Sequence, residues 1–460
     1  MPRYDLLIQE GMICTAEGTF IGDMGIKDGK IISLTNNAEG DASRVINAKG
    51  KLVLPGGIDV HVHFHNPYGK GYSVEGFFEG TRAAACGGIT TVIDFGVQDP
   101  KKGLMAGLHQ RMEEADPEVC IDYSLHAMIT AYNRSVSLEM VKAVELGIPT
   151  FKMYMAYKNY GWYSDDGMIY DALLHAKKLG GMILVHAESD TLVNYFISQY
   201  LPEKKKWGAY THALSRPNLV EAEAVSRMVY LTEATGGKSY IVHLSTAEGA
   251  DLIQQAKLEG IDIEAETCPQ YLLLDDNLFK DKEKGHLYAT CPQLKKPADI
   301  HRLWEAVLQG DINIIATDTC TFTHKQKDKW RGDFTKIPYG MPGVETLFPL
   351  MYTFGVKEGK IPLTRLVELI STQPAKKMGL YPQKGTLHIG ADADIIIIDP
   401  EKKKTIRAQN LNTVTDWSPY EGWELFGFPE YTLSRGKVVL DKGSFVGKKG
   451  QGRFISRKLS

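Results

Sequence analysis

The sequence lacks paired cysteines, long apolar runs and an excess of charge of either sign. Its six cysteines are scattered through 460 residues without a Cys-x-x-Cys pair, so we expect neither a thiolate zinc site nor a disulfide framework. Free cysteines are usually buried, and we expect these six to be reduced and packed in or near the core.

The sequence also lacks the patterns that are typical of membrane proteins, secreted proteins and nucleic-acid-binding proteins. No apolar run approaches the length of a bilayer span, and the stretch MPRYDLLIQEGMICT lacks the layout of a signal peptide. The net charge of −3 gives no basic footprint for nucleic acid. We therefore expect a cytoplasmic protein with a small-molecule partner, no membrane partner and no nucleic-acid partner.

Short β-rich runs alternate with amphipathic helical stretches through the middle of the chain. Such alternation is typical of repeated βα units around a parallel sheet. Eight units between residues 55 and 383 predict a (β/α)₈ TIM barrel, the catalytic domain. The expected strands are 57–64, 90–96, 121–129, 150–157, 182–189, 239–245, 261–268 and 312–318.

The two ends of the chain have a different texture. Residues 1–54 and 384–460 contain hairpin patterns such as IKDGKIISL and TLSRGKVVLDKGSF. We expect these ends to pair into one small β-sandwich domain, with two independent β caps as the alternative. The basic tail GKKGQGRFISRKLS is expected to be a solvated terminal arm.

Six unusual polar residues fall toward the carboxyl ends of five expected strands, which form the active-site face of such a barrel. One core histidine alone is more commonly satisfied by hydrogen bonds, but six residues from five strands favour a shared site. Imidazoles with a carboxylate suit a metal such as zinc. The six are His61, His63, Lys152, His186, His243 and Asp318.

Lys152 is the residue that does not fit a metal site as written. Four histidines and one aspartate exceed the needs of one tetrahedral zinc, and two neighbouring metal ions require an anionic bridge. A buried lysine loses its charge readily, and its neutral amine can react with CO₂ to give a carbamate. We therefore expect Lys152 to be N-carboxylated and to join two metal ions.

Several motifs resemble, in order and spacing, those of cyclic amidohydrolases of the hydantoinase and dihydropyrimidinase family. They are PGGIDVHVHF, TFKMYMAY, LVHAES, IVHLS, ETCPQYLLLD, ATDTC, PQKGTLHIGADADIIIIDP and SPYEGWELFGFPEYTLSRGKVV. The resemblance covers nearly the whole chain. It implies a barrel with a β-sandwich, two zinc ions per subunit bridged by a carboxylated lysine and hydroxide, and a homotetramer.

The same resemblance implies a reaction and roles for the residues. The substrate would be a small cyclic ureide or imide, such as a 5-substituted hydantoin opened to an N-carbamoyl amino acid, or dihydrouracil opened to N-carbamoyl-β-alanine. Asp318 would act as base and then acid, while Tyr157 would stabilise the oxyanion. One zinc would be held by His61, His63 and Asp318, the other by His186 and His243, with Lys152 between them.

Three positions depart from the family pattern. Cys291 and Tyr339 stand where the family has substrate-contacting serine and asparagine, and Thr319 replaces a histidine. The resemblance implies that the serine and asparagine contacts run largely through main-chain groups, so Cys291 and Tyr339 stay candidate substrate-binding residues. In proteins that this chain resembles, the loop corresponding to the aromatic stretch MYMAYKNYGWY packs around the exocyclic substituent of the substrate. Its aromatic density leads us to expect a pocket for aromatic or bulky 5-substituents.

Two alternatives remain open from the sequence. An allantoinase would typically carry a Glu-Pro-Gly-Arg-like stretch after the His-x-His motif, where this chain has HNPYGKGY. A non-catalytic scaffold with the same fold is a possibility of a different class, because fold alone does not define activity. Dihydroorotase is disfavoured because His65 replaces its typical arginine.

Overall fold

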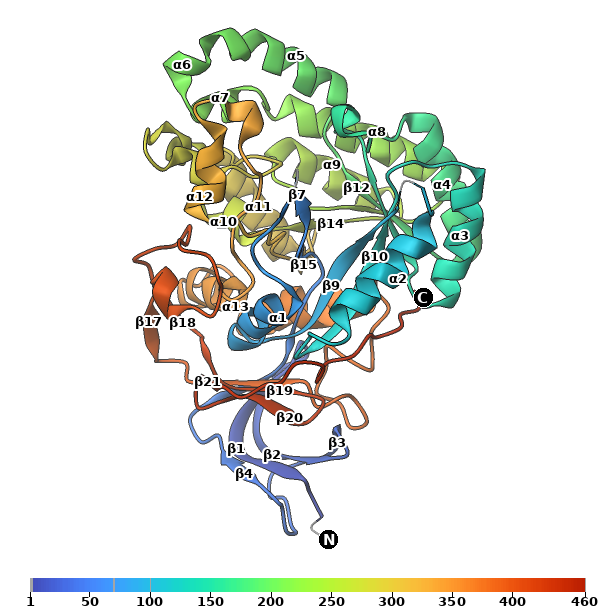
Figure 1. Ribbon diagram of the computed structural model, residues 1–460. Helices are drawn as coiled ribbons and strands as arrows, with labels where there is room; N and C mark the ends of the chain where they lie inside the picture. Colours follow the sequence, from blue (N-terminus) through green and yellow to red (C-terminus); the bar gives the residue numbers. More distant parts are fainter. Residues whose placement is uncertain (1–2, 69–70, 100, 460) are drawn as a thin grey trace.

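The structure is a computed structural model that describes residues 3–68, 71–99 and 101–459. It has two parts, a barrel of parallel strands surrounded by helices and a smaller mixed sheet packed below it (Figure 1). All six cysteines are free and buried, as expected. Among the described residues, no helix combines the length and apolar character that a membrane span requires.

Eight parallel strands form the barrel, which confirms the expected fold. Neighbouring strands pair in sequence order, and the first and last are joined through the Val62 to Thr319 bridge, where the His63 amide donates to the Thr319 carbonyl at 2.9 Å. The strands are β6 (Gly57–Asp59), β9 (Ile89–Val97), β10 (Asp122–Met128), β11 (Thr150–Tyr154), β12 (Met182–His186), β13 (Ser239–Ile241), β14 (Ile263–Thr267) and β15 (Ile314–Ile315).

Several strands end earlier than the sequence pattern predicts. Tyr157, His243 and Asp318 lie where the expected strands were still extended, yet their φ angles are 69°, 42° and 51°. A left-handed backbone cannot continue a strand, so the chain turns there. These turns occur at the carboxyl ends of β11, β13 and β15, on the face where we expect the functional site.

Helices cover the outside of the barrel, and local capping explains several of their ends. For example, the Asp165 side chain accepts a hydrogen bond from the Met168 amide at the start of α4, and Gly180 ends that helix with φ of 65°. The principal helices are α1 (Phe77–Cys86), α2 (Leu104–Ala115), α3 (Arg134–Glu145), α4 (Asp166–Leu179), α5 (Asp190–Tyr200), α8 (Leu219–Thr235), α9 (Ala247–Leu258) and α11 (Pro297–Gln309).

Shorter elements fill the connections. These are α6 (Lys204–Trp207), α7 (Tyr210–Leu214), α10 (Pro269–Leu273), α12 (His324–Lys327), α13 (Leu347–Met351), α14 (Leu363–Val367) and α15 (Gln373–Lys377), with the small hairpins β7 (Pro67–Tyr68) with β8 (Gly71–Tyr72) and β17 (Lys403–Thr405) with β18 (Glu424–Phe426).

Both ends of the chain contribute to one nine-stranded sheet, which confirms one shared unit over two separate caps. β5 and β16 join the two ends as antiparallel neighbours, with Val53 opposite Ile397. The exact boundaries at residues 54 and 384 stay a prediction. The strands are β1 (Leu6–Cys14), β2 (Thr19–Lys27), β3 (Lys30–Thr35), β4 (Val45–Asn47), β5 (Leu52–Pro55), β16 (Ile395–Ile398), β19 (Pro429–Ser434), β20 (Lys437–Asp441) and β21 (Ser444–Phe445).

The C-terminal tail is not a solvated arm, so that expectation was wrong. It runs back to the barrel beside α3 (Figure 1), where the Arg457 amide donates to the Gly147 carbonyl at 2.9 Å. The Arg457 side chain is 3% exposed. Its guanidinium donates to the hydroxyls of Ser124 and Thr150 at 2.8 and 2.7 Å, and also to the Leu125 carbonyl. These acceptors explain why a basic residue is buried there.

A buried ion cluster joins the barrel to the small sheet. The Lys384 ammonium lies 2.7 Å from a carboxylate oxygen of Asp122, 3.1 Å from Asp392 and 2.6 Å from Asp394. Arg435 adds a second cation on Asp122 at 2.9 Å. The three carboxylates are thereby compensated by cations of this chain, which makes the cluster structural.

We expect Arg457→Ala to lower the free energy of unfolding by about 3 kcal/mol, because it leaves several buried acceptors without their charged donor. Denaturation by urea measures the change. Arg453→Ala is the matched control, since its side chain is exposed on the same tail, and it should cost about 0.5 kcal/mol or less. Equal losses in the two variants would contradict the structural role of the tail.

Candidate metal centre and active site

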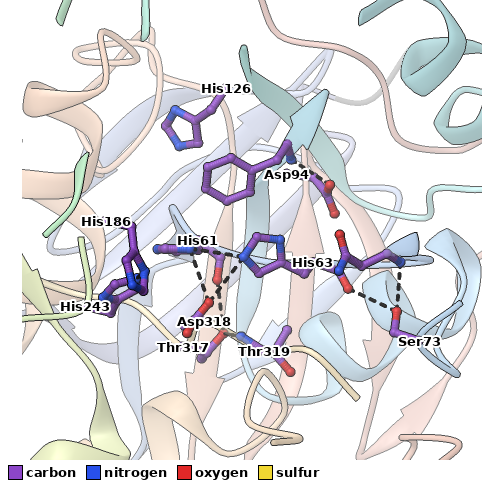
Figure 2. A network of polar contacts seen from close by, with 12 residues as sticks. His61, His63, Ser73, Asp94, His126, His186, His243, Thr317, Asp318 and Thr319 are labelled. Carbon is purple, nitrogen blue, oxygen red and sulfur yellow. Dashed lines mark hydrogen bonds and ion pairs between the residues drawn. The ribbon is translucent and has the colours of Figure 1, made fainter. Parts of the chain in front are cut away.

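His61, His63 and Asp318 converge at the carboxyl ends of the first and last barrel strands (Figure 2). The Nε2 atoms of both histidines lie 3.2 Å from Oδ1 of Asp318 and 3.2 Å from each other. All three donor atoms lie within 4.8 Å of one another, as ligands of one metal ion would. The expected first group of ligands is thus assembled in space.

His186 and His243 form a second group beside the first (Figure 2). Nδ1 of His186 lies 3.0 Å from Nε2 of His243. The ring centroid of His243 is 5.5 Å from that of His61, so the two groups are immediate neighbours.

Lys152 is buried beside both groups. It is 1% exposed, and its Nζ lies 5.6 Å from the ring centroid of Phe95, whose own centroid is within 4.8 Å of the centroids of His61 and His63. Burial lowers the pKa of Lys152 to about 7, against the opposing effects of Glu266 and Asp318. A substantial neutral fraction is therefore accessible at neutral pH.

The imidazoles of His61, His186 and His243 are also neutral. Burial lowers the pKa of His186 and holds those of His61 and His243 well below the usual value. A neutral imidazole is the form that binds a metal. Within the described part of the chain, Nδ1 of His243 is buried and has no hydrogen-bond partner. Neutral ring nitrogens that face one another, with one buried nitrogen unpartnered, fit a site for metal cations.

Burial also acts on Asp318, but it does not decide the charge of this carboxylate. Burial raises the pKa of Asp318, and the neighbouring imidazoles of His61 and His63 outweigh burial and leave it below the usual value. Asp318 is therefore ionised at neutral pH and can serve as a ligand or as a base.

Two buried glutamates orient the histidines, and the sequence analysis missed both. Glu266 on β14 contacts Nδ1 of His61 and accepts the Tyr240 hydroxyl at 2.8 Å. Glu188 lies 2.8 Å from Nε2 of His186. Each carboxylate holds one ring nitrogen, so the other nitrogen points toward the centre. A carboxylate two residues after His186 in the expected strand 182–189, and so on the same face of that expected strand, was the available signal for Glu188.

Glu188 also connects His186 to residues that line the wall of the site. Arg216 donates to Glu188 through Nη1 at 2.6 Å, and the Arg216 guanidinium lies 5.7 Å from the ring centroid of Tyr339. Tyr339 also stacks on His212 at 4.9 Å. The Tyr339 ring is thus packed into the wall, which leaves its main chain to face other groups.

Tyr157 and Cys291 lie close together next to the second histidine pair. The Tyr157 ring centroid is 4.9 Å from that of His186, and its hydroxyl is within hydrogen-bonding reach of the Cys291 thiol. Burial raises the pKa of Tyr157 well above its usual value, so the phenol stays protonated. Burial raises the pKa of Cys291 to about 12, which makes this thiol unsuited to nucleophilic attack.

The structure shows what the Thr319 side chain does, which the sequence alone did not. Its hydroxyl donates to the Met341 carbonyl at 3.4 Å and accepts from the Gly343 amide at 3.1 Å. Thr319 therefore fastens the segment that follows Tyr339 to the end of the last strand.

The expected aromatic loop forms beside Lys152. The Trp162 ring centroid is 5.5 Å from that of Tyr154 and 6.2 Å from those of Tyr157 and Tyr160. This cluster gives the mouth of the barrel an apolar wall.

The geometry agrees with what comparisons with known proteins show. Residues 52–439 match the sequence profile described as the Amidohydrolase family. The chain is 39% identical to a D-hydantoinase of Geobacillus stearothermophilus over 454 residues, or 98% of this chain and 96% of the relative. It is 40% identical to a D-hydantoinase of Ralstonia pickettii over 456 residues, or 99% of each.

Solved structures give the same result. A D-hydantoinase from Bacillus sp. AR9 has a TM-score of 0.97 at 36% identity, and a dihydropyrimidinase from Brevibacillus agri NCHU1002 has 0.96 at 35%, each over 99% of both chains. The chain belongs to the amidohydrolase family, in its hydantoinase and dihydropyrimidinase branch. This family is metal-dependent, in keeping with the clustered donors.

We expect Glu266→Gln to weaken metal binding by about 10- to 100-fold, because the carboxyl group that orients His61 becomes an amide while the side chain keeps its size. Metal content after dialysis against a graded chelator measures the affinity. Glu264→Gln is the control on the same strand, since Glu264 pairs with Lys257 and Lys377 instead of a histidine. Unchanged metal content in the Glu266 variant would refute its role.

Proposed function

We propose that the protein hydrolyses a ring C–N bond of hydantoins and dihydropyrimidines. A 5-substituted hydantoin would give an N-carbamoyl amino acid, and dihydrouracil would give N-carbamoyl-β-alanine. The observation that carries the proposal is the convergence of four imidazoles, one carboxylate and one buried lysine at one end of the barrel. Similarity to D-hydantoinases over the full chain supports it.

The proposed cofactor is a pair of zinc ions. His61, His63 and Asp318 would hold one, His186 and His243 would hold the other, and N-carboxylated Lys152 would bridge them together with hydroxide. When bound, two such ions supply hydroxide at neutral pH and polarise the ring carbonyl. The low pKa of Lys152 is consistent with the neutral amine that carboxylation requires.

Asp318 is the proposed proton carrier. Its carboxylate is ionised and fixed between His61 and His63, so it can accept a proton when the ring carbonyl is attacked. It can then deliver this proton to the ring nitrogen as the C–N bond breaks. One carboxylate thereby serves as base and acid in turn.

Tyr157 is the proposed donor to the oxyanion. Its phenol is protonated and lies beside His186, and its left-handed backbone, with φ of 69°, turns the residue out of the strand toward the site. A fixed donor stabilises the charge that develops on the carbonyl oxygen.

We assign the substrate ring to the main chain beside Cys291 and Tyr339. The Tyr339 side chain is engaged by His212 and Arg216, which supports recognition through backbone groups. The aromatic cluster around Trp162 would receive the exocyclic substituent, which favours aromatic or bulky 5-substituted hydantoins.

The alternatives fit less well. Allantoinase is not favoured, because the relatives reported above are hydantoinases and a dihydropyrimidinase. A non-catalytic scaffold would not need six intact donor residues, since an uncompensated buried polar cluster is costly.

A homotetrameric assembly and a cytoplasmic location stay predictions.

A substrate panel tests the function. We expect purified protein, grown with zinc and bicarbonate, to open hydantoin, dihydrouracil or D- and L-substituted hydantoins, as measured by loss of ring absorbance. Faster opening of allantoin would reverse the ranking of candidates. Metal analysis that finds well below one zinc per chain would rule out the two-zinc enzyme.

We expect Lys152→Ala to lose metal and activity together, because the bridge between the two groups of ligands is removed. Metal analysis and the ring-opening assay measure both. Small added carboxylates should restore part of the activity by replacing the bridge. A fully metallated and active variant would refute the carboxylated lysine.

A further inference from the structure

A second buried lysine, Lys327, plays no part in the proposed chemistry. It ends the short helix α12 and is 0% exposed. Its Nζ donates a hydrogen bond to the Ala289 carbonyl at 3.0 Å and lies 5.9 Å from the ring centroids of both Phe322 and Trp417. Burial lowers the pKa of Lys327 to about 7. The placement is costly, so a structural reason is expected.

The oxygen that Lys327 holds is shared with another segment. The Gly340 amide also donates to the Ala289 carbonyl, at 3.0 Å. Ala289 is two residues before Cys291, and Gly340 directly follows Tyr339. The two segments assigned above to the substrate ring therefore meet at one carbonyl oxygen.

Close packing against the segment at Cys320 restricts the backbone where Gly340 meets the Ala289 carbonyl. Gly340 has φ of 135°, and a Cβ atom placed there would lie 2.3 Å from the Cys320 carbonyl oxygen. The Cys320 amide in turn donates to the Met341 carbonyl at 3.2 Å. The backbone next to Gly340 is thus pressed against the loop that follows Asp318.

The aromatic groups around Lys327 are themselves fixed. Trp417 Nε1 donates to the Phe322 carbonyl at 2.7 Å, and the Thr415 hydroxyl donates to the same oxygen at 3.1 Å. The ammonium therefore meets two aromatic rings and one carbonyl oxygen. Aromatic faces attract a cation, which offsets part of its lost hydration.

An apolar side chain of similar length would fill this space without the cost of burying a charge. What only the lysine supplies is a second donor to the Ala289 carbonyl, in addition to the Gly340 amide. We propose that Lys327 is a positioning residue for substrate recognition, holding the main-chain segments beside Cys291 and Tyr339 in register through the Ala289 carbonyl. The inference rests on the proposed function, which assigns these segments to the substrate.

The test compares Lys327→Met with wild type in the zinc-loaded full chain. Methionine keeps the length and removes the donor, so we expect KM for hydantoin to rise about tenfold while kcat changes less than about threefold. Lys327→Gln keeps an N–H donor, so its KM for hydantoin should lie between those of wild type and Lys327→Met. If Lys327→Met does not fold, Lys327→Gln is the variant compared with wild type. Lys325→Met, exposed on the same helix, should leave both constants unchanged.

Hydrogen exchange gives a readout that does not depend on turnover. In Lys327→Met, peptides covering 285–293 and 338–343 should exchange faster, while peptides from β11 should match wild type. An active wild type with an unchanged KM in Lys327→Met overturns this inference alone. A wild type that opens no ring in the panel overturns the proposed function and the inference with it.

Discussion

The burial of Lys152 beside four imidazoles is the constraint on which the rest of the site depends. A charged ammonium there would repel any bound cation at the same centre, by roughly 4 kcal/mol for two unit charges 4 Å apart at an effective dielectric constant of 20. The surroundings fit a lysine that is not a cation, because burial lowers the pKa of Lys152 to about 7 against the opposing effects of Glu266 and Asp318. Burial also holds the pKa values of His61 and His243 well below the usual value, so these neighbours are neutral. The burial of a lysine in β11 is therefore explained only by the cluster of side chains around it.

The backbone shows a matching constraint. Tyr157, His243 and Asp318 all adopt left-handed conformations, each of which costs on the order of 1–3 kcal/mol. A closed barrel can support them because its strands are fixed by parallel neighbours on both sides. The same turns end the strands and bring side chains from distant parts of the sequence to one centre.

Much of this was accessible from the sequence. Eight βα units and six polar residues at strand ends follow short-range patterns, so the barrel and the convergence of its donors could be predicted. Strand ends could not, because apolar periodicity does not report φ. Glu266 and Lys327 were missed because their partners, His61 and Ala289, are distant in sequence. Composition was misleading for Arg457, since a basic tail is usually solvated and the acceptors on Ser124, Leu125 and Thr150 lie more than 300 residues away.

That tail also bears on how the molecule is made. Arg457 and Ser124 are separated by 333 residues, and Tyr123 on β10 bridges to Phe454. During synthesis the early barrel strands emerge from the ribosome long before the segment that covers them. The polar groups of these strands that bind the C-terminal segment have no partner until that segment is made. The contacts between β10 and the C-terminal segment therefore form only once translation has passed residue 457. Such long-range closure slows folding.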